Sequence, residues 1–296
     1  MKKILNSLLV VALLVGLFLG GLYFNDIKSW ATSQFERGQI IDGGGDGNGD
    51  NGGDNGGDIE INSISFAQDD WSIIAQVSKA IATGEENIWY EVGDEKNILI
   101  GEEIYAVHIL GFNHDDLSDG SGKAGISIGM VGLVRYNDNS MNPSPITNVG
   151  GWDGSFMRNV TIQTVFSQLP NELQTMIKAV DKPTTAGNQD TSIVNSQDKL
   201  WLFSEYEVNG GDLAGVSNGV LPVQEGEQYE YWHTVKNGAL SADRIKHLST
   251  GTAGSWWLRT PTNTNSVSFY FIGYDGGLGW AGSSYSSIFI CFGFCI

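Results

Sequence analysis

The first hydrophobic feature of the chain is an unbroken apolar run near its start. Residues 4–24 are all apolar or small, apart from Asn6, Ser7 and Tyr23. The run matches the ~17 to 25 residues that cross a bilayer as a helix, and the two lysines before it favour a cytoplasmic N-terminus. We therefore expect residues 1–24 to be a transmembrane anchor, with the rest of the chain outside the cell. A cleaved signal peptide, with Ser29-Trp30-Ala31 as a poor cleavage site, is the alternative.

The apolar pattern gives way to a segment that contains only glycine, aspartate and asparagine, residues 42–58. Glycine has the most backbone entropy to lose on folding and the aspartates repel one another, so the segment is typical of a flexible linker. An EF-hand loop starting at Asp46 does not fit, because Asn51 and Gly57 stand where glycine and a bidentate glutamate are needed. We expect a linker over residues 25–58 and an exported domain over residues 59–296.

Within this domain, short helical and extended patterns alternate with turn-rich segments. The helical spacing of Trp71, Ile74, Val77 and Ile81 predicts a helix capped at Asp69-Asp70 and closed by Gly84. Further helices are predicted over residues 155–168, 170–180 and 226–236. Extended runs predict strands over residues 88–92, 104–112, 125–134, 199–208 and 255–260. Scattered strands with few helices indicate an α+β fold.

The C-terminal tract alternates as a strand does. Val267, Phe269 and Phe271 alternate with more polar neighbours, so one set should face the core and the other a ligand. Gly276-Gly277 permits a turn, after which the exposed surface should continue. Residues 288–296 are too apolar for solvent, and we expect them to form a buried strand. The predicted ligand-binding residues are Ser268, Tyr270, Ile272, Tyr274, Gly279, Trp280, Gly282, Ser283, Ser284, Tyr285 and Ser287.

Charge and composition restrict the partners. The chain has 16 Lys and Arg against 34 Asp and Glu, a formal net charge of -18. This argues against a nucleic-acid partner, because phosphates must be met by clustered basic residues. The tract over residues 262–296 lacks Lys, Glu, Gln and Met but is rich in Tyr, Phe, Ser and Gly, as antibody paratopes are. A terminal β-meander is the alternative explanation, because strands disfavour Lys and Glu and turns favour Gly, Ser and Asp.

Candidate catalytic groups are few. His114-Asp115-Asp116 has the residue types of a metal site or of a base with its orienting carboxylate, but it precedes a turn in which such residues cap backbone amides. Glu205 and Glu207 would share one face of the predicted strand, either as an acid/base pair or in an ion pair with Arg259. The histidines follow no ligand spacing. We predict no catalytic residue, metal ligand or cofactor.

Cys291 and Cys295 are the only thiols. If both lie on one strand, their Cα atoms are roughly 13 Å apart, beyond the ~7 Å limit for a disulfide. The even spacing would place both on one face. We therefore expect two buried, unpaired cysteines that pack as small apolar residues.

Several motifs, in one order, resemble the bacterial and phage family DUF6273. They span residues 71–296 and read ILGFNHDD, SGKAGISIG, MNPSPITNVGGWDGSFMR, LPNELQTMIKAV, DKLWLFSEYEV, EGEQYEYW, SWWLRT and FGFCI. The resemblance implies a C-type-lectin-like domain with short mixed or antiparallel sheets. This is also the architecture of formylglycine-generating enzymes and of the variable proteins of diversity-generating retroelements. In those variable proteins, adenine-directed mutagenesis rewrites a C-terminal region that forms the ligand-binding face.

The resemblance implies that residues 262–296 are such a variable region. Adenine replacement in AAC or AAT codons never yields Lys, Glu, Gln, Met or Trp, so Trp280 would be fixed by the template. The implied function is a cell-surface, adhesin- or receptor-like module that binds an extracellular protein or glycan, without enzymatic activity. A carbohydrate-binding lectin is one alternative, although the Glu-Pro-Asn, Gln-Pro-Asp and Trp-Asn-Asp motifs of calcium-dependent lectins are missing. An oxidase of the formylglycine-generating type, using Cys291 and Cys295, is another.

Overall fold

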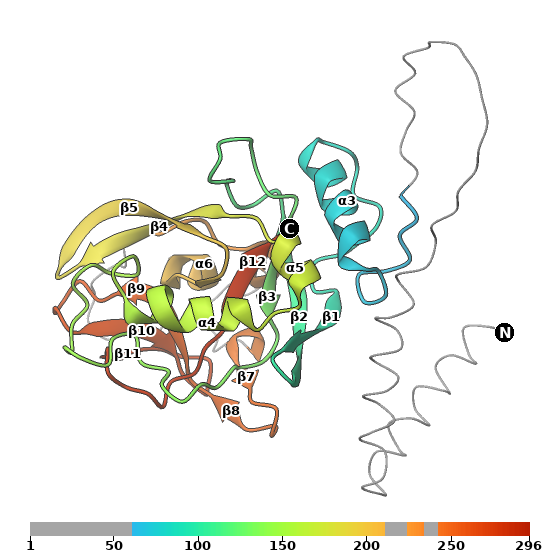
Figure 1. The fold of residues 1–296 in the computed structure, drawn as a ribbon. Coiled ribbons are helices and arrows are strands. Elements are labelled where there is room, and N and C mark those ends of the chain that lie inside the picture. Colours follow the sequence, from blue (N-terminus) through green and yellow to red (C-terminus); the bar gives the residue numbers. More distant parts are fainter. Residues whose placement is uncertain (1–60, 211–223, 234–241) are drawn as a thin grey trace, which may run out of the picture. The chain divides into compact units, whose positions relative to one another are not determined.

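The computed structural model of the chain describes residues 61–210, 224–233 and 242–296 (Figure 1). The predicted anchor over residues 1–24 and the predicted linker over residues 25–58 lie outside these described residues. Within the described ranges, none of the helices combines the length and the apolar character needed to span a membrane. The described part is an α+β fold with several small antiparallel sheets and few helices.

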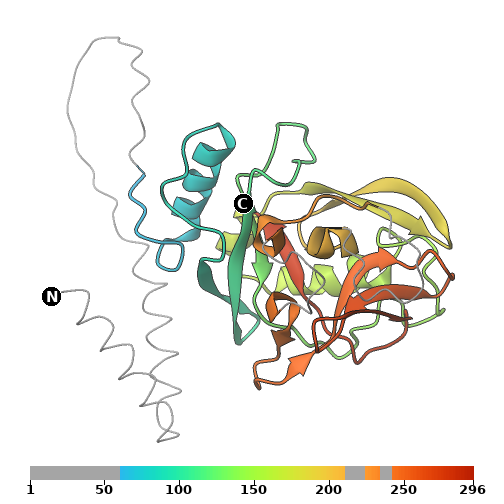
Figure 2. The same cartoon turned by 180° about the vertical axis from the view of Figure 1, so that it is seen from behind.

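The largest sheet has five strands in the order β1-β2-β3-β12-β6. All neighbouring pairs are antiparallel. In this order, the final strand of the chain lies between β3 and β6, two strands from distant parts of the sequence (Figure 2). Every residue of β3 and β12 is buried, which confirms the predicted buried C-terminal strand. The strands are β1 (Glu95–Ile100), β2 (Glu103–Phe112), β3 (Ile126–Met130), β12 (Phe292–Cys295) and β6 (Trp201–Leu202).

A pair of glycines lets an aromatic ring cover the middle of this sheet. Gly293 of β12 pairs with Gly129 of β3. A Cβ at Gly293 would lie 2.8 Å from the Phe203 ring, and one at Gly129 would lie 3.0 Å from it. Phe203 is itself fully buried and contacts the Trp232 ring edge to face at 5.1 Å. Both strands therefore require glycine at the point where this ring crosses them.

Helix α3 (Trp71–Ala82) follows the predicted spacing, with Trp71, Ile74, Val77 and Ile81 all buried. Asp70 occupies the predicted N-cap position, although its side chain makes no capping hydrogen bond, and Gly84 adopts a positive φ of 95° beyond the helix end, as predicted. The Trp71 ring meets the Phe294 ring edge to face at 6.1 Å, which places α3 against the last strand. The sequence prediction of this helix is confirmed.

The remaining helices are short. A π-helical turn (Met157–Thr161) leads into α4 (Ile162–Ser167), and α5 (Asn171–Met176) begins directly after Pro170. The predicted helix over residues 170–180 is too long, because Lys178 already bridges to Cys295 of the large sheet. The other helices are α6 (Glu205–Asn209), α7 (Glu230–His233) and the 3₁₀ helix η2 (Ala242–Arg244).

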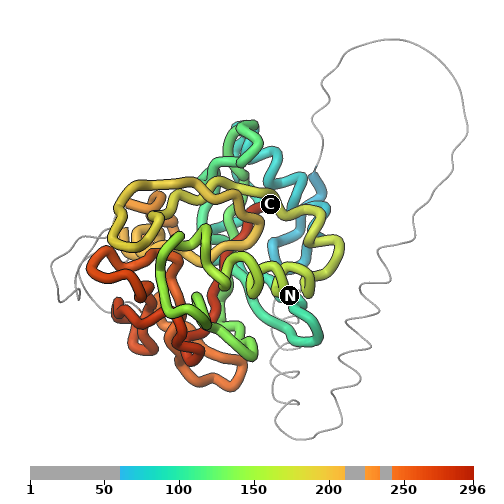
Figure 3. Tube along the Cα trace, turned by 60° about the vertical axis from the view of Figure 1, so that its left-hand side comes forward, coloured from blue at the N-terminus to red at the C-terminus, as the bar shows by residue number. Residues whose placement is uncertain are grey.

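A long hairpin, absent from the sequence predictions, joins β4 (Val180–Gly187) to β5 (Asp190–Asp198). Asn188 and Gln189 form its tip with positive φ angles of 52° and 65°, which suits a hairpin turn. Strand β4 is largely buried, whereas most of β5 faces solvent. The hairpin lies alongside the C-terminal strands, where β4 contacts β9 (Figure 3).

A three-stranded sheet in the order β11-β10-β9 carries the C-terminal tract. Both adjacent tryptophans of β9 are fully buried, and each indole N–H donates to a backbone carbonyl, Trp256 to Arg244 and Trp257 to Asn139. The strands are β9 (Trp256–Pro261), β10 (Ser268–Ile272) and β11 (Leu278–Gly282), next to the small pair β7 (Lys246–His247) and β8 (Ala253–Gly254).

Two predicted strands are wrong. Residues 88–92 are irregular, with a bend at Trp89 and a turn from Val92, and the strand begins only at Glu95, after Gly93 adopts a positive φ of 93°. The predicted strand over residues 199–208 ends at Leu202, because Ser204 starts helix α6. The Ser204 hydroxyl accepts from the Glu207 amide and the Glu207 carboxylate accepts from the Ser204 amide, a reciprocal capping box. Glu205 and Glu207 therefore do not share a strand face.

Candidate functional site

The predicted outward face of β10 is buried. Ser268, Tyr270 and Ile272 expose only 8%, 6% and 0% of their surface, so their predicted orientation toward solvent is wrong. Strand β10 is the central strand of its sheet. Tyr270 lines a small enclosed space together with Thr185 of the β4–β5 hairpin. The unforeseen hairpin therefore lies beside Tyr270, which the alternation assigned to a ligand.

The exposed residues of the tract lie on the edge strand and in the turns beside it. Tyr274, Trp280 and Tyr285 expose 67%, 47% and 58% of their surface. Ser287 is also exposed, while Gly279, Gly282 and Ser284 are partly exposed. The exposed part of the predicted surface therefore lies on β11 and on the loop that follows it, and not on the central strand β10.

Of the predicted site residues, Trp280, Gly282, Tyr285 and Ser287 border an open groove of about 590 Å³, called here the aromatic groove, whereas Gly279 and Ser284 do not line it. Phe271 lies beside the buried Trp257 ring, with ring centroids 6.3 Å apart. A Cβ at Gly279 would lie 2.6 Å from the Phe271 ring, so only glycine lets this ring lie across β11. Tyr274 is not part of the groove lining, and we do not assign it to the site. The groove is lined by Ser255, Asn265, Ser268, Phe271, Trp280, Ala281, Gly282, Tyr285, Ser287 and Ile288.

A buried asparagine ties the groove to a loop outside the tract. The amide group of Asn148 donates to the carbonyls of Thr262, Asn265 and Ser268 at 3.3, 3.0 and 2.9 Å. Its side-chain oxygen accepts from the Asn188 amide at 2.8 Å, at the tip of the β4–β5 hairpin. One side chain thus fixes both ends of the connection between β9 and β10. No local sequence pattern indicates this role, because the partners of Asn148 are 40 to 120 residues away.

Ser283 serves the same framework, and its predicted place on the exposed surface is wrong. It is fully buried, and its hydroxyl accepts from the Thr147 amide at 2.9 Å. Its backbone carbonyl accepts from the Asn142 amide at 2.9 Å, and its amide donates to the Val267 carbonyl at 2.8 Å. These bonds fix the loop after β11 to the segment over residues 142–148.

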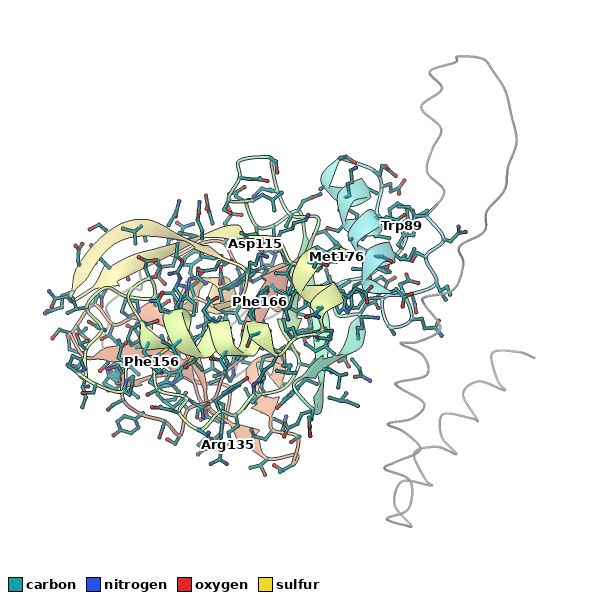
Figure 4. The ribbon with its side chains drawn as sticks, viewed as in Figure 1. Trp89, Asp115, Arg135, Phe156, Phe166 and Met176 are labelled. Carbon is teal, nitrogen blue, oxygen red and sulfur yellow. The ribbon has the colours of Figure 1, made fainter. Side chains whose placement is uncertain are left out.

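Behind the C-terminal sheet lies a buried ionic network formed by Asp115, Lys182, Glu207 and Arg259. The Lys182 ammonium pairs with Asp115 at 2.6 Å and with Glu207 at 2.7 Å. Arg259 holds both Glu207 carboxylate oxygens, at 2.5 and 3.0 Å, which confirms the predicted ion pair with Glu207. None of the four side chains exposes more than 4% of its surface. Figure 4 labels Asp115, which lies beside the hairpin and the last strand.

The network contains two acidic and two basic side chains. Burial raises the pKa of Asp115, but the Lys182 ammonium, His114 and the hydrogen bonds from Lys182 and Ser127 together hold that pKa well below its usual range. Burial likewise raises the pKa of Glu207, and the attraction of Arg259 and Lys182 brings it below its usual value. Burial lowers the pKa of Lys182, and Asp115 and Glu207 more than compensate. The four groups are therefore ionised together and rigidify the scaffold under the tract.

A third buried carboxyl group, that of Glu225, lies beside the network. It accepts from the Thr185 amide at 2.7 Å, from the Thr185 hydroxyl at 2.8 Å and from the Thr260 hydroxyl at 2.6 Å. Burial raises its pKa despite the attraction of Arg259. Glu225 joins the β4–β5 hairpin to β9 and so stabilises the same scaffold.

The His114-Asp115-Asp116 triplet does not converge on one point. His114 stacks on the Tyr229 ring at 4.0 Å, Asp115 belongs to the buried network, and Asp116 pairs with Lys123 at 3.0 Å. Over the described residues, no group of three His, Cys, Asp or Glu side chains is placed to hold a metal ion.

Both thiols are free and fully buried, as the sequence analysis expected. Burial raises the pKa of Cys291 to about 11. Burial also raises the pKa of Cys295 well above its usual value, and the neighbouring Asp115 carboxylate adds to the shift. Both are therefore protonated near neutral pH, whereas nucleophilic or redox chemistry requires an accessible thiolate.

Comparison with known proteins gives one match. The model of the family described as "Domain of unknown function (DUF6273)" matches residues 127–296, which is more than half of the chain. The match includes the aromatic groove and three members of the buried network, but it begins after the ILGFNHDD motif. No curated protein and no solved structure matches the chain.

Proposed function

The chain belongs to the DUF6273 family, and we propose that it is a cell-surface module whose aromatic groove binds an extracellular ligand. The observation that carries the proposal is the clustering of Trp280, Tyr285 and Phe271 around one open groove. Two of these rings expose about half of their surface. Tyr and Trp give large contact areas at low cost in side-chain entropy, which is why binding sites use them.

The rigidity of the framework supports the proposal. Binding is stronger when the contact residues are held in place before the ligand arrives. The Asn148 and Ser283 hydrogen bonds fix the segments on either side of the groove, and Arg259 anchors β9 to the ionic network. The framework residues are buried, whereas Trp280 and Tyr285 are not. Replacing the exposed side chains would therefore alter binding more than folding.

The proposal includes a C-type-lectin-like architecture and diversification of the exposed positions within residues 262–296. Tyr274, Ser284, Tyr285 and Ser287 are at least partly exposed, and adenine replacement in asparagine codons yields each of these residue types. Trp280 lies outside that set and would be constant. The coding DNA tests this part: a neighbouring reverse transcriptase and an adenine-rich near-copy of the tract are expected, and the absence of both would remove diversification from the proposal.

Surface display rests on the apolar run over residues 4–24 and the two lysines before it. In the proposed arrangement, the N-terminus is cytoplasmic and the folded domain is outside the cell. Protease treatment of intact cells tests this orientation. The domain should be degraded without lysis, and protection of the domain until the cells are broken would contradict the proposal.

The binding function is tested on an array of purified extracellular proteins and glycans, probed with the full chain. At least one saturable interaction should weaken in both Trp280→Ala and Tyr285→Ala. Tyr274→Ala is the matched control, because it removes an exposed aromatic ring of the same tract that does not line the groove. Interactions that all survive the two groove variants would exclude the aromatic groove as the binding site.

A further inference from the structure

We infer that the aromatic groove binds an uncharged saccharide. The inference rests on the proposed function and adds the chemical class of the ligand. It follows from three independent properties of the groove: its size, its lack of charge and the mixture of rings and polar groups in its lining.

The size of the groove fits one or two sugar rings. Ten residues line it, and its volume of about 590 Å³ falls among the roughly 300 to 1,000 Å³ of small-molecule sites. A stable protein–protein interface takes about 20 to 30 residues from each partner. The groove is therefore of the scale of a small ligand or of the end of a larger glycan.

The lining contains no Asp, Glu, Lys, Arg or His, although the chain as a whole has a net charge of -18. A charged ligand would lose hydration on entering the groove and would find no opposite charge to replace it. The groove therefore favours a neutral ligand.

The lining combines aromatic rings with polar groups that have no internal partner. Within the described residues, no hydrogen bond is made by the hydroxyl of Ser255, Tyr285 or Ser287 or by the indole N–H of Trp280. Asn265 uses its side-chain oxygen to accept from the Val267 and Ser268 amides, which leaves its NH₂ group available. These groups line the same groove as the Phe271, Trp280 and Tyr285 rings.

A pyranose ring complements this surface. Its C–H groups carry partial positive charge and stack on the negative face of an aromatic ring. Its hydroxyl groups act as both donors and acceptors, so they can bond to the serine hydroxyls, the amide and the indole N–H. A purely apolar ligand would cover these polar groups without replacing their hydrogen bonds to water, which is unfavourable.

The test is binding of the full chain, in a detergent without a sugar headgroup, to the array described above. The array carries neutral hexose-terminated oligosaccharides, their sialylated and sulfated counterparts, and purified extracellular proteins. We expect saturable binding to neutral glycans that EDTA does not abolish. Trp280→Ala should weaken binding about three- to tenfold, the range for loss of one aromatic contact, whereas Trp280→Phe and Tyr274→Ala should bind within about twofold of the parent.

The contrary results distinguish an error in the ligand class from an error in the binding site. No saturable binding to any neutral glycan, or binding only to sialylated or sulfated glycans, overturns the inference. Glycan binding that EDTA abolishes, or that Trp280→Ala leaves intact, overturns binding by the aromatic groove. Binding confined to protein spots and lost in Trp280→Ala overturns the saccharide but retains the proposed function. Circular dichroism of every variant separates these outcomes from misfolding. Replacing Trp280 should leave the fold intact, because its side chain is exposed on an edge strand.

Discussion

The ionic network makes a sharp prediction for the Glu207→Gln variant. Glutamine has nearly the same shape as glutamate and can still accept from the Ser204 amide, so the capping box of α6 is preserved. What changes is the charge between Lys182 and Arg259. Lys182 retains Asp115, whereas Arg259 retains only carbonyl acceptors, those of Leu202, Pro183 and Glu225.

The expected cost is about 3 to 5 kcal/mol, because removing one partner of a buried pair leaves an uncompensated charge. All members of the network are almost fully buried, so solvent screening does not reduce this figure. Each kcal/mol lowers the midpoint of a domain of this size by roughly 2 to 4 °C, and the variant should therefore melt roughly 6 to 20 °C lower.

The assay is urea unfolding followed by tryptophan fluorescence, together with thermal unfolding followed by circular dichroism. Glu86→Gln is the matched control, since Glu86 lies exposed in a loop and its replacement should change stability by less than about 0.5 kcal/mol. A loss below about 1 kcal/mol in Glu207→Gln would show that Glu207 is not the shared counter-ion of Lys182 and Arg259.

Three further predictions concern the framework and the thiols. Asn148→Ala should lose about 2 to 4 kcal/mol in urea unfolding, since four hydrogen bonds depend on that side chain, and an unchanged midpoint would contradict its anchoring role. The raised pKa of Glu225 means that its contribution to stability is complete below its unfolded pKa and is lost as pH rises through its folded pKa. The stability advantage of the parent over Glu225→Gln should therefore shrink between pH 4.5 and pH 8, and an advantage that grows would reverse the assigned shift. Ellman's reagent at pH 8 should leave Cys291 and Cys295 unmodified until the protein is unfolded, and rapid reaction of either native thiol would contradict their burial.

Elements with strong local patterns were predictable from the sequence. Helix α3 has a helical repeat, with Asp70 at its N-cap position and a glycine just beyond its other end, so local residues indicate where it begins and ends. The last strand is apolar on both faces, as a central strand of a covered sheet must be. The ion pair of Arg259 was also predictable, because a buried guanidinium needs an acidic partner.

The orientation of the C-terminal tract depended on distant segments and was not predictable locally. Alternation along β10 distinguishes two faces, but it cannot show that the β4–β5 hairpin lies beside Tyr270. Burial of Ser283 follows from its bonds to residues 142–148, far away in sequence. The start of α6 was recoverable, because Ser204 and Glu207 have the spacing of a capping box.

The most direct test of the central claim is a ¹⁹F NMR titration of the full chain labelled with 5-fluorotryptophan, using the neutral glycan that binds best on the array. Trp280→Phe identifies the Trp280 resonance. We predict that this resonance shifts with the same midpoint as binding, while the resonances of the fully buried Trp152 and Trp201, which do not line the groove, do not move. Saturable binding without any change at Trp280 would contradict the claim that the aromatic groove is the recognition surface.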